Sequence, residues 1–141
     1  MMEYKHIAVV VDFDKESEIL VKKGASIARA FGAKLSLIHI DDNYDELYVS
    51  VVCLDLRDFR DKVSVHSISR LEYYKTLIDY PVSYTLVSNG DLTKELCLMI
   101  SEYNIDVVVC GHHHDFWSKT LSSTHHFFNS SLVDTLVVPF Q

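Results

Sequence analysis

The sequence predicts a three-layer α/β sandwich built on a five-stranded, mainly parallel sheet. Apolar, β-branched runs alternate along the chain with segments of helical spacing, which is the order of a parallel sheet covered by helices. In most of these runs the apolar residues are consecutive and do not alternate with polar ones, as in strands that are buried on both faces. The chain has 141 residues, of which 48% are hydrophobic, so we expect a single domain over residues 1–141.

The first strand and the first helix are predicted from residues 6–32. Residues His6–Val11 read HIAVVV and form the first strand. Asp14 is the expected N-cap of the helix that follows, and Gly32 is its expected C-terminal stop. Between these two signals, residues that suit a buried helical face recur at helical spacing: Leu20, Gly24, Ile27, Ala28 and Phe31.

The second strand is predicted at Leu35–Ile40, which reads LSLIHI, and the acidic stretch Asp41–Glu46 is expected to be a loop. A long helix is expected from about Asp55 to about Asp79, because Pro81 disfavours helical backbone at the residue before it. The apolar stripe of this helix is imperfect and contains Leu56, Phe59, Val63, Leu71, Tyr74 and Ile78.

The rest of the chain repeats the alternation of strand and helix. Residues Val82–Ser88 alternate more than the other strands, which is typical of an edge strand, and residues 89–91 form a turn and an N-cap. We expect a buried strand at Val107–Cys110, a helix around Ser122–Asn129 and a last strand at Leu136–Phe140. The helix after residue 91 has a clear stripe: Leu92, Leu96, Met99, Ile100 and Tyr103.

A ligand site in such a domain would lie beyond the carboxyl ends of the strands, where the winding of the chain reverses. Flavodoxin-like and Rossmann-like strand orders both fit this sequence of elements. The strand ends are marked by Asp12, Ile40 and Gly111, and the loop Gly111–Lys119 lies where a phosphate cradle would form. This loop has one glycine, and the chain has neither GxGxxG nor GxxxxGK[ST]. The motif evidence is therefore against a phosphate cradle.

Several segments of the sequence resemble segments of a known protein family, and they occur in the same order along the chain. The most specific is VVVCGHHHDFWSK at Val107–Lys119. The others are YKHIAVVVD at residues 4–12, KLSLIHIDDNYDELY at 34–48, NGDL at 89–92 and VDTLVVPF at 133–140. In these segments the chain resembles the universal stress protein family, and within it the A branch, which is not known for ATP binding.

The resemblance implies an adenine nucleotide alpha hydrolase-like fold with strand order 3-2-1-4-5 and dimerisation through the last strand. It also implies a degenerate nucleotide site. The ATP-binding branch carries G-x-x-G and, after a spacer, G-[ST]. Here Gly111 keeps the first position, whereas the other three hold His114, Thr124 and His125. The base-side positions Asp12 and Ile40 match, so the loss concerns phosphate binding, and no cofactor is expected.

Other chemistry is weighed against simple structural roles. Three consecutive histidines, 112–114, rarely direct their side chains at one ion, so we expect no metal site. Cys110 lies within an apolar run and is expected to be a core residue rather than a nucleophile. A net charge of −7 argues against nucleic-acid binding, and no apolar run reaches the roughly 18 residues that a membrane helix needs. Three widely spaced cysteines without a secretory signal favour the cytoplasm.

The resemblance and the degenerate cradle together predict a non-enzymatic stress-response regulator without catalytic residues. It would act as a homodimer, or as a heterodimer with related stress proteins. The alternative is a nucleotide-binding member of the family with weak or no hydrolysis, and a third hypothesis is a redox or metal-responsive module. The strand expected to form the dimer contains Leu136, Val137, Val138, Pro139 and Phe140.

Overall fold

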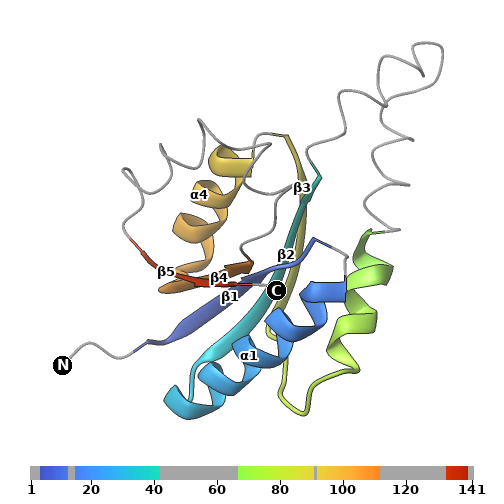
Figure 1. Ribbon diagram of the computed structural model, residues 1–141. Coiled ribbons are helices and arrows are strands. Elements are labelled where there is room, and N and C mark those ends of the chain that lie inside the picture. Colours follow the sequence, from blue (N-terminus) through green and yellow to red (C-terminus); the bar gives the residue numbers. More distant parts are fainter. Residues whose placement is uncertain (1–3, 13–14, 42–66, 91, 112–132, 140–141) are drawn as a thin grey trace.

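The computed structural model describes residues 4–12, 15–41, 67–90, 92–111 and 133–139. In this part of the chain, five strands form one sheet in the order β3-β2-β1-β4-β5, and every neighbouring pair is parallel (Figure 1). The predicted fold class and strand order are therefore confirmed. The strands are β1 (His6–Val10), β2 (Lys34–Asp41), β3 (Tyr84–Asn89), β4 (Val107–Gly111) and β5 (Asp134–Val138).

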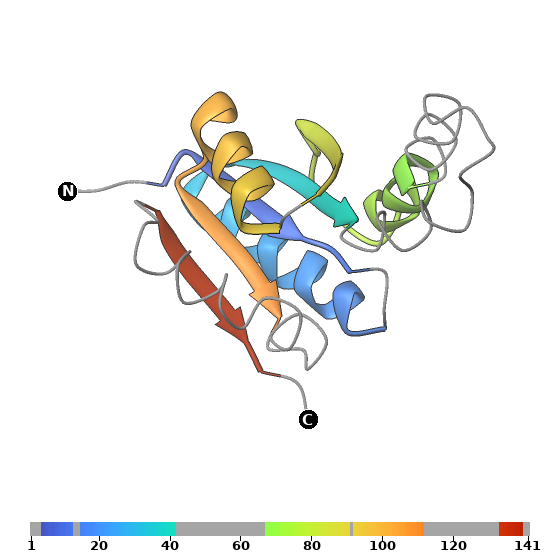
Figure 2. The same cartoon turned by 90° about the horizontal axis from the view of Figure 1, so that it is seen from above.

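Helices cover both faces of the sheet and complete the three layers. Helix α1 (Lys15–Phe31) and helix α4 (Leu92–Tyr103) lie on opposite faces, as Figure 2 shows. A further helical segment, residues 67–75, lies on the α1 side (Figure 1), and its Leu71 and Tyr74 belong to the same hydrophobic cluster as α1. This agrees with the apolar stripe that the sequence predicted for both residues.

The central strand β1 explains why its sequence is apolar without alternation. Ile7 and Val9 point into the cluster on the α1 side, whereas Ala8 and Val10 point into the cluster on the α4 side. Successive side chains of a strand point to opposite faces. Since both faces are covered by helices, every position of β1 must be apolar or have a buried polar partner.

Most predicted boundaries agree with the structure. Gly32 ends α1 with a φ of 64°, a left-handed conformation that glycine adopts without a steric penalty. The edge position predicted for the third strand is confirmed, since β3 is the first strand of the sheet. Asp14, Asp91, residues 42–66 and the helix expected around Ser122–Asn129 lie outside the described residues.

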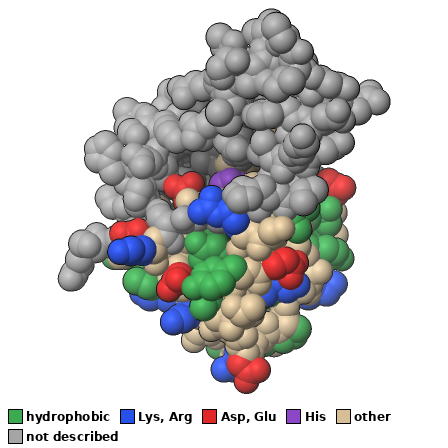
Figure 3. Space-filling view, turned by 90° about the vertical axis from the view of Figure 1, so that its right-hand side faces the viewer, with side chains coloured by type: hydrophobic (Ala, Val, Ile, Leu, Met, Phe, Trp, Pro, Cys, Tyr) green, Lys and Arg blue, Asp and Glu red, His purple; other side chains and the backbone are tan. Residues whose placement is uncertain are grey.

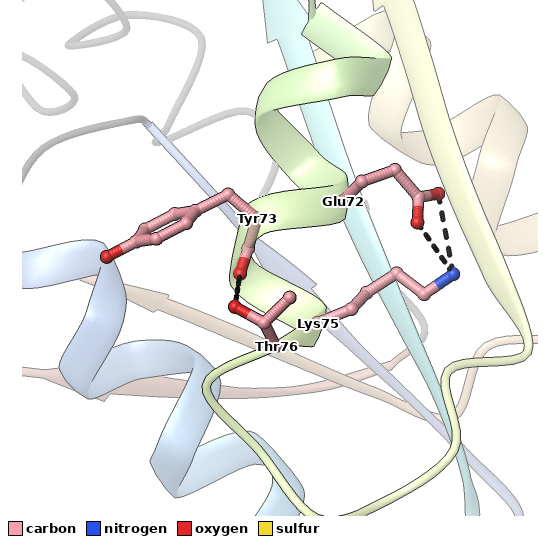
Figure 4. A network of polar contacts seen from close by, with 4 residues as sticks. All are labelled: Glu72, Tyr73, Lys75 and Thr76. Atoms are coloured by element: carbon pink, nitrogen blue, oxygen red, sulfur yellow. Dashed lines mark hydrogen bonds and ion pairs between the residues drawn. The ribbon is translucent and has the colours of Figure 1, made fainter.

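The end predicted for the helix before Pro81 was wrong. The helix ends at Lys75 rather than near Asp79, and a turn follows at residues 76–77. The Thr76 hydroxyl donates to the Tyr73 carbonyl, and the Thr76 N–H donates to the same oxygen at 3.0 Å (Figure 4). A threonine that bonds to the backbone of the preceding turn competes with continued α-helix. The Lys75–Glu72 pair in Figure 4 is solvent-exposed at 3.1 Å and contributes little.

The last strand also begins earlier than the sequence indicated. β5 runs from Asp134 to Val138, and Pro139 lies just after it instead of within it. Proline has no N–H to donate to a ladder, which explains why regular pairing stops before it. Phe140 lies outside the described residues.

Helix α1 approaches β1 through Gly24. A Cβ atom built on Gly24 would lie 2.3 Å from Cγ2 of Val9, a distance that no relaxed structure tolerates. Gly24 is buried in the middle of α1. Its lack of a side chain therefore sets how closely the helix packs on the central strand.

We expect Gly24→Ala to destabilise the protein by about 1–3 kcal/mol, because overpacking at Val9 outweighs the intrinsic helical preference for alanine. Urea unfolding measures the change. The control is the same substitution in a Val9→Ala background, where the clashing methyl group is absent and the cost should shrink. Gly24→Ala protein that is as stable as the parent would contradict this account of the packing.

Candidate functional site

The three sequence-predicted site residues lie within one residue of the same level across the centre of the sheet. Val10 pairs with Ile38, so Asp12, just beyond β1, lies level with Ile40 on β2. Val9 pairs with Val109, so Gly111 on β4 lies level with Val11, one residue before Asp12. The chain winds outward in both directions from β1, since β2 and β4 flank it. Asp12, Ile40 and Gly111 therefore meet at the switch point of the sheet, where ligands bind in open α/β folds.

These three residues offer different chemistry at that edge. Ile40 is buried in the cluster on the α4 side, and Gly111 is buried at the end of β4. Asp12 is exposed just beyond β1. Figure 3 shows charged side chains and a histidine side chain near the upper limit of the described surface, and a hydrophobic patch below them. Of the three residues, Asp12 alone presents an ionisable side chain.

The peptide group that joins Val11 to Asp12 has two side-chain partners. Nδ1 of His39 lies 2.8 Å from the Val11 carbonyl oxygen, and the Asp12 N–H donates to Oγ of Ser17 at 3.0 Å. Ser17 lies on α1 and His39 lies on β2, and both side chains are buried. Sequence reasoning missed both residues. The signal was available: His39 is a polar residue at an inward position of the apolar run LSLIHI.

Polar groups also lie at the carboxyl end of the edge strand β3, next to β2. The Ser88 hydroxyl donates to Oε2 of Glu95 at 2.7 Å, which ties the end of β3 to the first turns of α4. Gly90 connects the two elements with a φ of 130°, and Glu95 lies within 4 Å of the position of its missing Cβ. Asn89 pairs with Asp41 in the ladder, and its buried Oδ1 atom has no hydrogen-bond partner among the residues that the structure describes. None of these residues was a sequence-predicted site residue.

The alternative chemistries find no ligand set in the part of the chain that the structure describes. Among those residues, no three His, Cys, Asp or Glu side chains are grouped to hold a metal ion. Cys110 is buried at the end of β4, in agreement with its predicted core role, and Cys97 is half-buried. The histidines at positions 112–114 and the cradle positions His114, Thr124 and His125 lie outside the described residues. No helix in the described part is long and apolar enough to span a membrane.

Comparison with known proteins agrees with this architecture. The model of the universal stress protein family matches residues 3–139. Universal stress protein A of Escherichia coli is 44% identical over 140 residues, which cover 99% of this chain and 97% of that protein.

Solved structures are similar in fold at low identity. A universal stress protein family member from Burkholderia pseudomallei has a TM-score of 0.73 at 16% identity and covers 97% of both chains. The universal stress protein from Archaeoglobus fulgidus in complex with dAMP has a TM-score of 0.65 at 15% identity, over 97% of this chain and 99% of that one. With a family match over nearly all of its length and relatives at 44% identity, the chain belongs to the universal stress protein family.

Proposed function

We propose that this protein is a non-enzymatic, cytoplasmic stress-response regulator of the A type, which acts as a homodimer and has lost the phosphate side of a nucleotide site. The observation that carries this proposal is the sequence of the cradle. The chain is 44% identical to universal stress protein A over almost its whole length. His114, Thr124 and His125 occupy positions where the family resemblance implies Gly, Gly and Ser or Thr in the ATP-binding branch.

A phosphate cradle works because backbone N–H groups can come close to the phosphate oxygens, and glycine allows that approach. Imidazole and threonine side chains add volume at these positions and restrict the backbone. A negative net charge of −7 further disfavours a triphosphate in the absence of a built cradle.

The alternative function is nucleotide binding with weak or no hydrolysis. Two observations favour it: Asp12, Ile40 and Gly111 lie within one residue of the same level at the switch point, and a structure of similar fold holds dAMP. The two functions differ in whether the phosphate side contributes binding energy. Direct titration with ATP separates them.

We place the homodimer interface, and that of any heterodimer with a related stress protein, on β5. This strand lies at the edge of the sheet, and its outward Leu136 is 41% exposed. An apolar edge strand is a surface for pairing with another chain, and a twofold axis would pair two copies of β5. Leu136, Val137 and Val138 supply its apolar side chains, and Pro139 and the undescribed Phe140 follow them.

Cys110 supports the non-enzymatic assignment. Burial raises the pKa of its thiol to about 12, so the nucleophilic thiolate is not populated near neutral pH. This disfavours a role for Cys110 as a catalytic or redox-sensing nucleophile. The thiol is best understood as a small core side chain within the cluster on the α4 side.

Restoring the cradle tests the proposed loss. We expect the parent protein to bind Mg-ATP more weakly than ~1 mM in calorimetric titration, and His114→Gly/Thr124→Gly/His125→Ser to bind with a Kd below ~100 μM. Adding Asp12→Ala to the restored protein serves as the control and should weaken the recovered binding. Binding of ATP by the parent protein below ~100 μM would overturn the proposal and establish the alternative function.

A pair of charged substitutions tests the dimer. Leu136→Lys places a charge on the β5 edge and should convert the protein from dimer to monomer in light scattering, because the charge would be buried in the interface. Leu98→Lys is the matched control, since Leu98 is 54% exposed on α4, away from β5, and its substitution should leave the dimer intact. A monomeric parent protein at micromolar concentration would refute the dimer.

The raised pKa of Cys110 predicts a specific alkaline instability. Above about pH 9 the unfolded chain loses the thiol proton while the folded chain keeps it up to about pH 12. The folded state then binds more protons, so this group lowers stability by about 1.4 kcal/mol per pH unit in that window. In urea unfolding, the free energy of unfolding of Cys110→Ala protein should decline with pH less steeply than that of the parent protein, by this amount. Equal slopes for both proteins would contradict the buried neutral thiol.

A further inference from the structure

Two buried polar side chains hold the same peptide group at the end of the central strand. The carbonyl of Val11 and the N–H of Asp12 belong to one planar unit. His39 contacts its oxygen at 2.8 Å, and Ser17 accepts from its N–H at 3.0 Å. One contact comes from β2 and the other from α1, so two neighbouring elements fix this unit from both ends.

We infer that Ser17 and His39 are positioning residues that fix the Val11–Asp12 peptide group, and thereby the direction in which Asp12 leaves β1 toward the switch point. The inference deepens the proposed function and rests on it, because it treats Asp12 as the base-side position of the degenerate nucleotide site. Ser17 and His39 form a second layer of residues behind Asp12, which the proposed loss of the phosphate cradle leaves in place.

The tautomer of His39 follows from its partner. A carbonyl oxygen can only accept a hydrogen bond, so Nδ1 of His39 must carry the proton. On the other side, the Ser17 hydroxyl accepts from the Asp12 N–H. The peptide group therefore uses both its donor and its acceptor on side chains. By contrast, the preceding N–H, that of Val11, donates to the Ile38 carbonyl in the usual backbone manner at 2.7 Å.

Burial makes these two contacts strong determinants of conformation. Ser17 is 0% exposed and His39 is 8% exposed, and both lie beside the apolar cluster under α1. A buried polar group costs free energy unless it is hydrogen-bonded, so turning the peptide away would leave buried partners unsatisfied. The conformation that places Asp12 at the edge of the sheet is thus over-determined.

The chain provides a matched control at the opposite end of the sheet. His6 and Ser36 are also a buried histidine and a buried serine, 4% and 0% exposed. His6 contacts the Tyr103 carbonyl through Nδ1 at 2.8 Å and Oγ of Ser36 through Nε2 at 2.6 Å. Ser36→Ala therefore removes a buried hydroxyl group, as Ser17→Ala does, but far from Asp12.

Hydrogen exchange tests the positioning directly. We expect Ser17→Ala to speed exchange of the Asp12 amide at least about tenfold at matched global stability, with little change at the Val9 amide. Ser17→Thr keeps the hydroxyl and should preserve the protection, and Ser36→Ala should leave the Asp12 amide unaffected. Unchanged Asp12 exchange in Ser17→Ala protein, or an equal effect of Ser36→Ala, overturns the inference.

Ligand binding supplies the functional readout. In the His114→Gly/Thr124→Gly/His125→Ser protein, Ser17→Ala should weaken ATP binding about tenfold, whereas Ser36→Ala should leave the Kd within about twofold. Equal Kd values for the two variants would overturn the positioning role. If the glycine-restored protein binds no ATP, the account of the degenerate cradle fails, and the exchange experiment still decides the role of Ser17.

Discussion

The central strand β1 is paired on both edges and buried on both faces, and the other elements take their places from it. Its registers with β2 and β4 set the heights of all the strand ends around the switch point. Its alternating side chains divide the core into a cluster under α1 and a cluster under α4. The close approach at Gly24 then sets the distance of α1 from the sheet, which in turn brings Ser17 within reach of the end of β1.

A strand that is buried along its whole length needs polar partners where its ladder stops. Five polar side chains are buried in the described part of the chain, and four of them solve this problem at the two ends of the sheet. His6 and Ser36 connect the start of β1 to β2 and to the last turn of α4. Ser17 and His39 perform the corresponding task at the carboxyl end. Buried backbone groups are almost always paired, so these side chains follow from the topology.

The spacing of apolar residues along the sequence predicted those elements in which burial alone determines whether a position is apolar. The strand β1 and the stripe containing Leu96 and Met99 are examples, because burial alone requires apolar residues there. The helix end at Lys75 was missed because the predicted end was based on Pro81. The helix ends earlier because the Thr76 hydroxyl bonds to the Tyr73 carbonyl and competes with continued α-helix. The strand order followed from the family resemblance, since several windings satisfy the same sequence of elements. Ser17 and His39 were missed because a single polar residue in an apolar stripe does not reveal its partner.

The candidate site has two halves that depend on the core to different degrees. The half that we propose as base-side is anchored by buried groups: Asp12 follows a peptide that Ser17 and His39 hold, and Ile40 is part of the α4-side cluster. Replacing these residues would leave polar groups unsatisfied or cavities unfilled, so folding itself maintains them. The cradle positions after Gly111 serve phosphate binding through the absence of side chains. In our proposal, a chain of this fold can therefore lose the cradle and keep the rest of the edge.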